Sequence, residues 1–224
     1  MSDKDYFNRL INASFLDELT FAERKKIFDI FLKEIKPLPD EKIVDIGVFC
    51  GSIDPKMNFL ELLYPHPENI TAVGTEDGNF LEEKYRGLKF IRIVPNEPLP
   101  FKDDQFDIGF CSATIEHVGS LDNQKNFLKE TIRVCKRFFL ATPNRFYPVE
   151  FHTRAIFIHW LPKPIFRRMI KKMGLEFYSR EENLNLISRK ELLALVPEKY
   201  RKISKIIYHK LFGMPSNLIL VVKK

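Results

Sequence analysis

Apolar residues in this chain form short, nearly continuous runs that alternate with longer segments of helical periodicity. The β-rich runs cover residues 42–46, 70–75, 90–94, 106–112 and 138–142, and a helical pattern lies between the last two. Strands without a polar face are typical of a parallel sheet that helices cover on both sides. The alternation therefore predicts an α/β fold.

The pattern changes near the end of the chain. Two further β-rich runs, 202–208 and 217–222, are joined by only "HKLFGMPS". A crossover helix cannot fit in so short a connection, so this pair is predicted to be antiparallel. The whole sheet is then seven-stranded and mixed, parallel except for a C-terminal antiparallel hairpin, with helices on both faces.

The N-terminal segment is predicted to be helical. Hydrophobic residues recur at helical spacing through 27–35, and Thr20 with Glu23 has the spacing of a capping box. Prolines at 37 and 39 should end this helix before the first strand. We therefore expect residues 1–40 to form an N-terminal helical cap.

Residues 145–187 follow neither pattern and are dense in aromatic, proline and basic residues. We interpret them as an insertion between the fifth strand and a last helix, whose start is indicated by a second capping box, Ser188 with Glu191. Insertions at the carboxyl edge of an open sheet commonly cover the ligand crevice. The prediction is one domain over 1–224 with an aromatic, basic lid.

Composition narrows the class of protein. The 224 residues are 45% hydrophobic, which suits a single substantial core. Three cysteines without a C-x-x-C pair favour reduced thiols over disulfides or a zinc site, and no metal site is predicted. The net charge of +6 is spread along the chain, and no apolar run approaches the roughly 20 residues of a membrane span. A cytoplasmic protein is expected.

The stretch "KIVDIGVFCGS" ends the first strand with an acid and two glycines, Asp45, Gly47 and Gly51. A glycine there lets the backbone turn sharply and approach a ligand, and the next helix presents free N–H groups. The spacing matches neither the G-x-G-x-x-G dinucleotide fingerprint nor the G-x-x-x-x-G-K-[ST] phosphate loop. Hydride-transfer and kinase-like enzymes are thereby disfavoured.

Later strands carry an ordered series of motifs. They are Gly74 and Glu76; Leu99, Pro100, Phe101, Asp104, Phe106 and Asp107; Glu116, His117 and Val118; and Thr142, Pro143 and Asn144. With the glycine turn and the final hairpin, this series resembles the class I S-adenosylmethionine-dependent methyltransferases, in particular the type 11 small-molecule branch. The resemblance covers roughly 42–144 and the last two strands. It implies a Rossmann-like sheet and S-adenosyl-L-methionine as cofactor.

The resemblance also implies a division of labour among cofactor-binding residues. The turn from Asp45 through Gly47 to Gly51 would hold the methionine end, and Glu76 the ribose. Asn96 and Glu97 would lie near the adenine, and Ser112, Ala113 and Thr114 would line the floor. The apolar residues of the L-P-F and F-D motifs are expected to pack rather than to bind.

Phe49 departs from the family pattern because it stands where the family has its middle glycine. Either its side chain points away from the ligand or the turn is wider than usual. A non-catalytic member of the fold, kept as a binding module, is therefore one alternative to an enzyme.

The acceptor is predicted to be a small molecule, a sugar or a lipid-linked intermediate, methylated at oxygen or nitrogen. The motifs of enzymes that methylate DNA amino groups or cytosine C5 are absent. An RNA methyltransferase is suggested only by the net positive charge. His117, after the fourth strand, is the candidate catalytic base, because its pKa is ordinarily near neutral. His152 and His159 are weaker candidates for that role.

The segment 160–173 interleaves aromatic and aliphatic residues with Arg167, Arg168, Lys171 and Lys172. Such a stretch fits an anionic membrane face or a phosphate-bearing substrate. An amphipathic lid with a solvated basic side is the alternative. A peripheral contact with the inner membrane face is therefore a second expectation for localisation.

Overall fold

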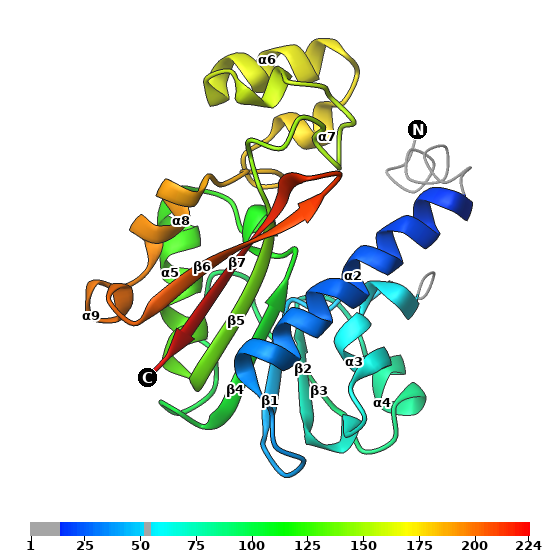
Figure 1. Cartoon of the computed structure of the whole chain (residues 1–224), viewed down its shortest axis with the longest axis vertical. Coiled ribbons are helices and arrows are strands. Elements are labelled where there is room, and N and C mark those ends of the chain that lie inside the picture. The colour runs from blue at the N-terminus through cyan, green and yellow to red at the C-terminus, as the bar shows by residue number, and fades with distance from the viewer. Residues whose placement is uncertain (1–13, 52–54) are drawn as a thin grey trace.

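The seven strands of the computed structural model, which describes residues 14–51 and 55–224, form one sheet in the order β3-β2-β1-β4-β5-β7-β6 (Figure 1). The strands are β1 (Ile43–Ile46), β2 (Ile70–Gly74), β3 (Lys89–Arg92), β4 (Phe106–Ser112), β5 (Cys135–Pro143), β6 (Ser204–Leu211) and β7 (Met214–Lys223). The first five are parallel, and β7 pairs antiparallel with both β5 and β6. The predicted α/β fold with its Rossmann-like, seven-stranded mixed sheet is confirmed.

Helices cover both faces of this sheet (Figure 1). The helices of the described residues are α2 (Ser14–Ile35), α3 (Phe59–Leu63), α4 (Phe80–Lys84), α5 (Leu121–Arg133), α6 (Lys163–Lys172), α7 (Glu176–Ser179), α8 (Arg189–Leu195) and α9 (Glu198–Arg201), of which α6 and α7 lie beyond the strand ends. Short 3-10 turns are η1 (Pro55–Met57), η2 (Pro67–Asn69), η3 (Ile115–His117) and η4 (Ile158–Trp160). Within the described residues, no helix is long and apolar enough to cross a membrane.

Two buried clusters hold the layers together, one on each face. On one face α5 and α8 pack on the sheet, and on the other α2, α3 and α4 do. The second cluster contains Phe31 of α2, whose ring centroid lies 5.2 Å from that of Phe110 on β4 and 5.4 Å from that of Phe139 on β5. Edge-to-face aromatic packing of this kind fixes α2 against the sheet.

The two predicted helix caps have different outcomes. At α8 the Ser188 side chain accepts from the Glu191 backbone N–H while the Glu191 side chain accepts from Ser188 N, so the capping box is confirmed. The Thr20–Glu23 box is wrong, because α2 already begins at Ser14. Glu23 instead contacts His209 of β6 at 2.7 Å, a partner 186 positions away that no local pattern reveals.

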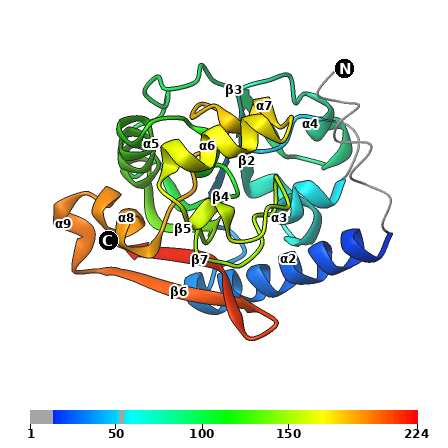
Figure 2. The same cartoon turned by 90° about the horizontal axis from the view of Figure 1, so that it is seen from above.

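The segment 145–187, called the lid below, lies beyond the ends of β4 and β5 (Figure 1, Figure 2). It contains η4, α6 and α7 and has a small core of its own around Phe166, Ile170 and Tyr178. Its two ends meet where Asn144 forms a bridge with Ile187 and Arg145 N donates to Ile187 O at 3.1 Å. The lid is therefore attached to the sheet at one place.

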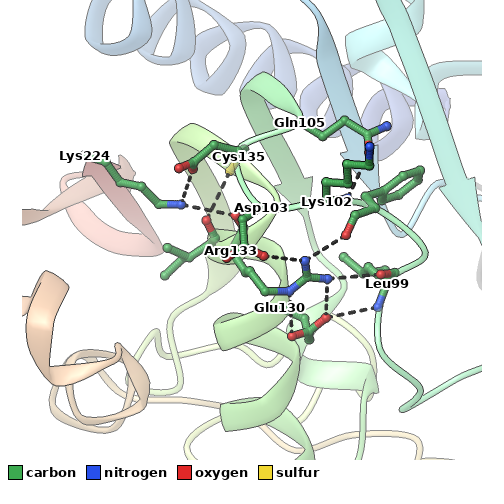
Figure 3. Close-up of polar contacts among 11 residues, drawn as sticks. Leu99, Lys102, Asp103, Gln105, Glu130, Arg133, Cys135 and Lys224 are labelled. Carbon is green, nitrogen blue, oxygen red and sulfur yellow. Dashed lines mark hydrogen bonds and ion pairs between the residues drawn. The ribbon is translucent and has the colours of Figure 1, made fainter.

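The L-P-F loop is held by Arg133 at the end of α5 (Figure 3). Its guanidinium donates to the carbonyl oxygens of Leu99 (3.1 Å) and Phe101 (2.8 Å) and pairs with Glu130 and Asp103. Glu130 in turn accepts from Leu99 N at 3.1 Å. The expected packing role of the L-P-F motif agrees with Leu99 and Phe101 being buried.

Substituting Arg133→Lys should destabilise the fold although it keeps the charge. An ammonium cannot hold two carbonyls and two carboxylates in the planar arrangement of a guanidinium. We expect the free energy of unfolding in urea to fall by roughly 1–3 kcal/mol. The exposed Lys125→Arg change on the same helix is the matched control and should stay within about 0.5 kcal/mol of the parent. Equal effects of the two changes would refute the clamp.

Candidate functional site

The residues predicted to bind the cofactor lie on loops that follow β1, β2, β3 and β4. Gly47 and Gly51 follow β1, Glu76 follows β2, and Ser112 ends β4. Because these strands are parallel neighbours, their carboxyl ends meet at one edge of the sheet. This is the edge at which open α/β sheets bind ligands.

The turn after β1 depends on a glycine at position 47. Gly47 has φ +94°, and its N–H donates to Val73 O of β2 at 2.8 Å. A Cβ there would lie 2.3 Å from the Thr114 side chain, a distance no real contact allows. Thr114 itself donates through Oγ1 to the carbonyls of Ser112 (3.1 Å) and Gly47 (3.3 Å). The missing Cβ therefore lets the loops after β1 and β4 come together.

Phe49 folds onto its own turn. A Cβ on Gly51 would lie 2.3 Å from a carbon of the Phe49 ring, so the ring covers the place where a larger residue at 51 would project. The ring remains 41% exposed. The Phe49 backbone is clamped by Asn58, which accepts from its N–H and donates to its carbonyl, both at 2.8 Å. Sequence reasoning missed Asn58, which lies in a segment without a recognisable motif.

Glu76 lies exposed after β2, and no described residue forms an ion pair or side-chain hydrogen bond with its carboxylate. It lies close to the glycine turn, since burial and the negative charges of Glu76 and Asp77 raise the pKa of the Cys50 thiol. The Cys50 sulfur also packs against Gly74, where a Cβ would lie 2.7 Å away. The Glu76 carboxylate, which when ionised can only accept hydrogen bonds, therefore lies near the glycine turn.

Asn96 and Glu97 lie exposed on the loop after β3, and Asn96 has φ +64°. Asparagine tolerates this left-handed conformation better than most residues do. Ala113 is also left-handed, at φ +52°, and its N–H donates to Ala141 O of β5 at 2.9 Å. The assignment of these residues, and of Ser112 and Thr114, to the cofactor stays a prediction.

Asp45 is placed differently from the other predicted cofactor residues, because its carboxyl is buried against that of Glu61 on α3. Among the residues that the structure describes, neither Glu61 oxygen has a hydrogen-bond partner. Two facing carboxyls can share a hydrogen bond only if one keeps its proton. Burial and the neighbouring acid raise the pKa of Asp45, and burial raises the pKa of Glu61 to about 7.

The predicted base, His117, is exposed in η3, directly after the loop of Ser112–Thr114. Its Nδ1 lies 2.6 Å from Asn183 O of the lid, and its ring centroid lies 4.8 Å from that of His152. His159 is buried, with Nε2 2.7 Å from Tyr147 O. The structure therefore brings His117 and His152 together and places His159 inside the lid.

These features fit an adenosyl cofactor. A turn with glycines at 47 and 51 lies near an acceptor-only carboxylate, and short side chains at 112–114, the predicted floor, lie at the end of β4. A carboxylate at that strand end can accept hydrogen bonds from both hydroxyls of a ribose. The donor set of the chain thus agrees with the ligand that the sequence predicts.

Comparison with known families gives one match. A family model described as a methyltransferase domain matches residues 58–138, from the start of α3 into β5. The glycine turn at 45–51, with Phe49, precedes the matched segment. No curated protein matches the sequence.

Solved structures with the same fold come from several organisms. A Pyrococcus horikoshii protein is 14% identical with a TM-score of 0.58, covering 95% of this chain and 92% of its own. An S-adenosylmethionine-dependent methyltransferase from Aquifex aeolicus is 14% identical with a TM-score of 0.52, covering 99% and 98%. One from Thermotoga maritima, described as a possible histamine N-methyltransferase, is 18% identical with a TM-score of 0.51, covering 93% and 95%.

At these identities the structures establish the fold, and the family match adds the methyltransferase domain. The predicted resemblance to class I methyltransferases of the type 11 branch is thereby confirmed, and with it S-adenosyl-L-methionine as the cofactor that this domain implies.

The Asp45–Glu61 pair should make stability depend on pH. Both carboxyls bind protons more tightly when folded, so their contribution is complete below the unfolded pKa of about 4.5 and is lost as pH rises through about 7. The parent should lose stability between about pH 4.5 and 7, by at most about 1.4 kcal/mol per pH unit for one proton. Glu61→Gln removes this proton, so its slope should be shallower.

Urea unfolding at several pH values measures the slope. The exposed Glu83→Gln change on α4 is the matched control and should reproduce the parent. A Glu61→Gln slope as steep as that of the parent would show that the pair does not hold a proton.

Proposed function

We propose that this protein is an S-adenosylmethionine-dependent methyltransferase that acts at oxygen or nitrogen of a small-molecule, sugar or lipid-linked acceptor. One observation carries the proposal. The Glu76 carboxylate, which has no partner among the described residues, lies near the Gly47–Gly51 turn at the carboxyl edge of a sheet with the methyltransferase strand order. The matched methyltransferase domain supports the same conclusion.

Each part of this edge has a task in the proposal. Glu76 accepts hydrogen bonds from a ribose diol, and the turn from Gly47 to Gly51 brings backbone N–H groups to the amino-acid end. Asn96 and Glu97 border the base, and Ser112 to Thr114 form the floor. The bound cofactor supplies an activated methyl group, so the protein's main tasks are alignment and exclusion of water.

The acceptor would enter between η3 and the lid. His117 projects there from the residues that follow the floor, and its contact with Asn183 joins η3 to the lid. A lid anchored at this point can exclude water from the reacting atoms while it contacts the acceptor. His117 is therefore the residue that we place nearest the acceptor.

Binding of S-adenosylhomocysteine, followed by isothermal titration calorimetry, tests the cofactor half. Glu76→Gln should weaken binding about 10–100-fold, because hydrogen bonds to a charged group contribute about 1.5–3 kcal/mol. Glu83→Gln, an exposed acid on α4, should bind as the parent does. No heat and no thermal stabilisation of the parent at millimolar ligand would favour the non-catalytic binding module instead.

We also propose that the lid touches an anionic membrane face, which suits a lipid-linked acceptor. On α6, Phe166 and Ile170 face the lid core, whereas Ile165 and Met169 are exposed at a spacing of four, and Met173 continues their row. Such spacing places them on one helix face. An apolar stripe at this position is what an interfacial helix requires.

Basic residues flank this stripe. Arg167 pairs with Glu181 at 2.9 Å and Lys171 with Glu176 at 3.2 Å. For Arg168 and Lys172, by contrast, no described acid lies within ion-pair distance. These two cations are therefore the ones available to lipid phosphates on the inner face of a membrane.

Vesicle co-sedimentation tests this contact. Each cation near an anionic surface contributes about 1 kcal/mol, so Arg168→Gln with Lys172→Gln should weaken partitioning to phosphatidylglycerol vesicles about 10–30-fold. Lys125→Gln with Lys129→Gln on α5 removes the same charge elsewhere and should have a much smaller effect. If both double variants lost partitioning equally, binding would be explained by the net positive charge of the protein, and the proposed contact of the lid would be refuted.

A further inference from the structure

Three side chains with metal-binding atoms gather where η3 meets the lid. They are Glu116 and His117 of η3 and His152 of the lid, and one ligand atom from each lies within 4.8 Å of the others. Glu116 and His117 are adjacent in the sequence, whereas His152 follows His117 by 35 positions. The fold alone creates this cluster.

The hydrogen-bond partners of both imidazoles favour a tautomer that can bind a metal through Nε2. His117 Nδ1 lies 2.6 Å from Asn183 O, and a carbonyl oxygen can only accept, so this nitrogen carries the hydrogen. His152 Nδ1 lies 2.7 Å from Glu150 Oε1. Glu150 also accepts from the Thr153 N–H and hydroxyl, both at 2.6 Å, as an ionised carboxylate does. In its neutral form each ring therefore keeps the lone pair of Nε2 for another partner.

The carboxylate of the cluster has a buried oxygen without a partner. Glu116 is fully buried, and its Oε2 accepts from the Thr142 hydroxyl at 2.9 Å. Its Oε1 has no hydrogen-bond partner among the residues the structure describes. Burying an unsatisfied carboxylate oxygen is costly, and coordination of a cation removes that cost.

Backbone contacts hold Glu116 firmly in place. Asn185 N donates to Glu116 O at 2.7 Å, and Gln124 donates to both Ile115 O (3.0 Å) and Asn185 O (2.8 Å). This network fixes the backbone of Glu116, and the Thr142 hydrogen bond holds its carboxylate, which has a ligand atom within 4.8 Å of those of both histidines.

We propose that Glu116, His117 and His152 bind one divalent first-row transition-metal ion. Two imidazoles and one carboxylate suit such ions, whereas Mg²⁺ and Ca²⁺ prefer oxygen ligands alone. A metal-bound histidine usually donates its other ring N–H to a backbone carbonyl or a carboxylate, and His117 and His152 have such partners. Three protein ligands leave positions open to the exposed side of His117.

The position of this metal site suggests a role in binding the acceptor, and this role rests on the proposed function. It follows the floor residues Ser112–Thr114 directly, on the side where the acceptor would lie. A cation there orients an acceptor that carries an oxygen ligand, such as a hydroxyl or a phosphate, and lowers the pKa of a bound hydroxyl. His117 would then be a ligand and not a free base.

Metal binding itself can be measured without cofactor or acceptor. Untagged full-length protein is stripped with a chelator and titrated with Mn²⁺, Co²⁺ and Zn²⁺ by calorimetry, and the bound metal is quantified by mass spectrometry after dialysis. We expect one ion per chain for at least one of the three metals and a rise in Tm on binding. His117→Gln, an exposed position, should weaken binding at least tenfold.

Two further variants separate ligation from general effects. His66→Gln removes a half-buried histidine that precedes η2 and β2, at the other edge of the sheet from the cluster, and should bind metal as the parent does. Glu150→Gln keeps the ligands but weakens the hold on His152, and should cost about 10–100-fold in affinity. Circular dichroism of each stripped variant checks that the fold is kept.

Failure of the site and failure of the proposed function are distinguishable. No stoichiometric binding of any of the three ions, or equal binding by the parent and His117→Gln, would overturn the metal site. Metal binding without S-adenosylhomocysteine binding would leave the site standing and remove the methyltransferase proposal.

Discussion

Close contact between the Gly47 backbone and the Thr114 side chain determines how the ends of β1 and β4 meet. Any side chain at 47 would displace Thr114, which lies directly before η3. A change in the glycine turn would therefore shift both the predicted floor at 112–114 and the cluster around Glu116. One missing Cβ sets the distance between the two halves of the proposed site.

Phe49 is accommodated by its immediate neighbours. The Asn58 amide satisfies both polar groups of the Phe49 backbone, and Gly51 leaves room for the ring. The family pattern has a glycine at this position. In this chain the position is Phe49, and the Asn58 side chain holds its backbone in place. Phe49 and Gly51 precede the segment that the methyltransferase family model matches, which begins at Asn58.

Sequence reasoning predicted the features that local patterns encode. The strands follow from apolar runs, the hairpin from a short connection, and the Ser188 cap from a four-residue motif. The Thr20 cap failed because the same motif can occur inside a longer helix. Arg133, Asn58 and Glu61 were missed because their partners are brought to them by the fold. The metal cluster escaped for the same reason, since only packing of the lid places His152 beside η3.

The lid enters and leaves the sheet at a single point, the bridge between Asn144 and Ile187. A segment closed at its base in this way can change length or sequence without altering the register of the strands below it. The lid, which faces the proposed acceptor, can therefore be replaced in evolution without changes in the sheet. A common catalytic platform would remain while the molecules admitted to it diversified.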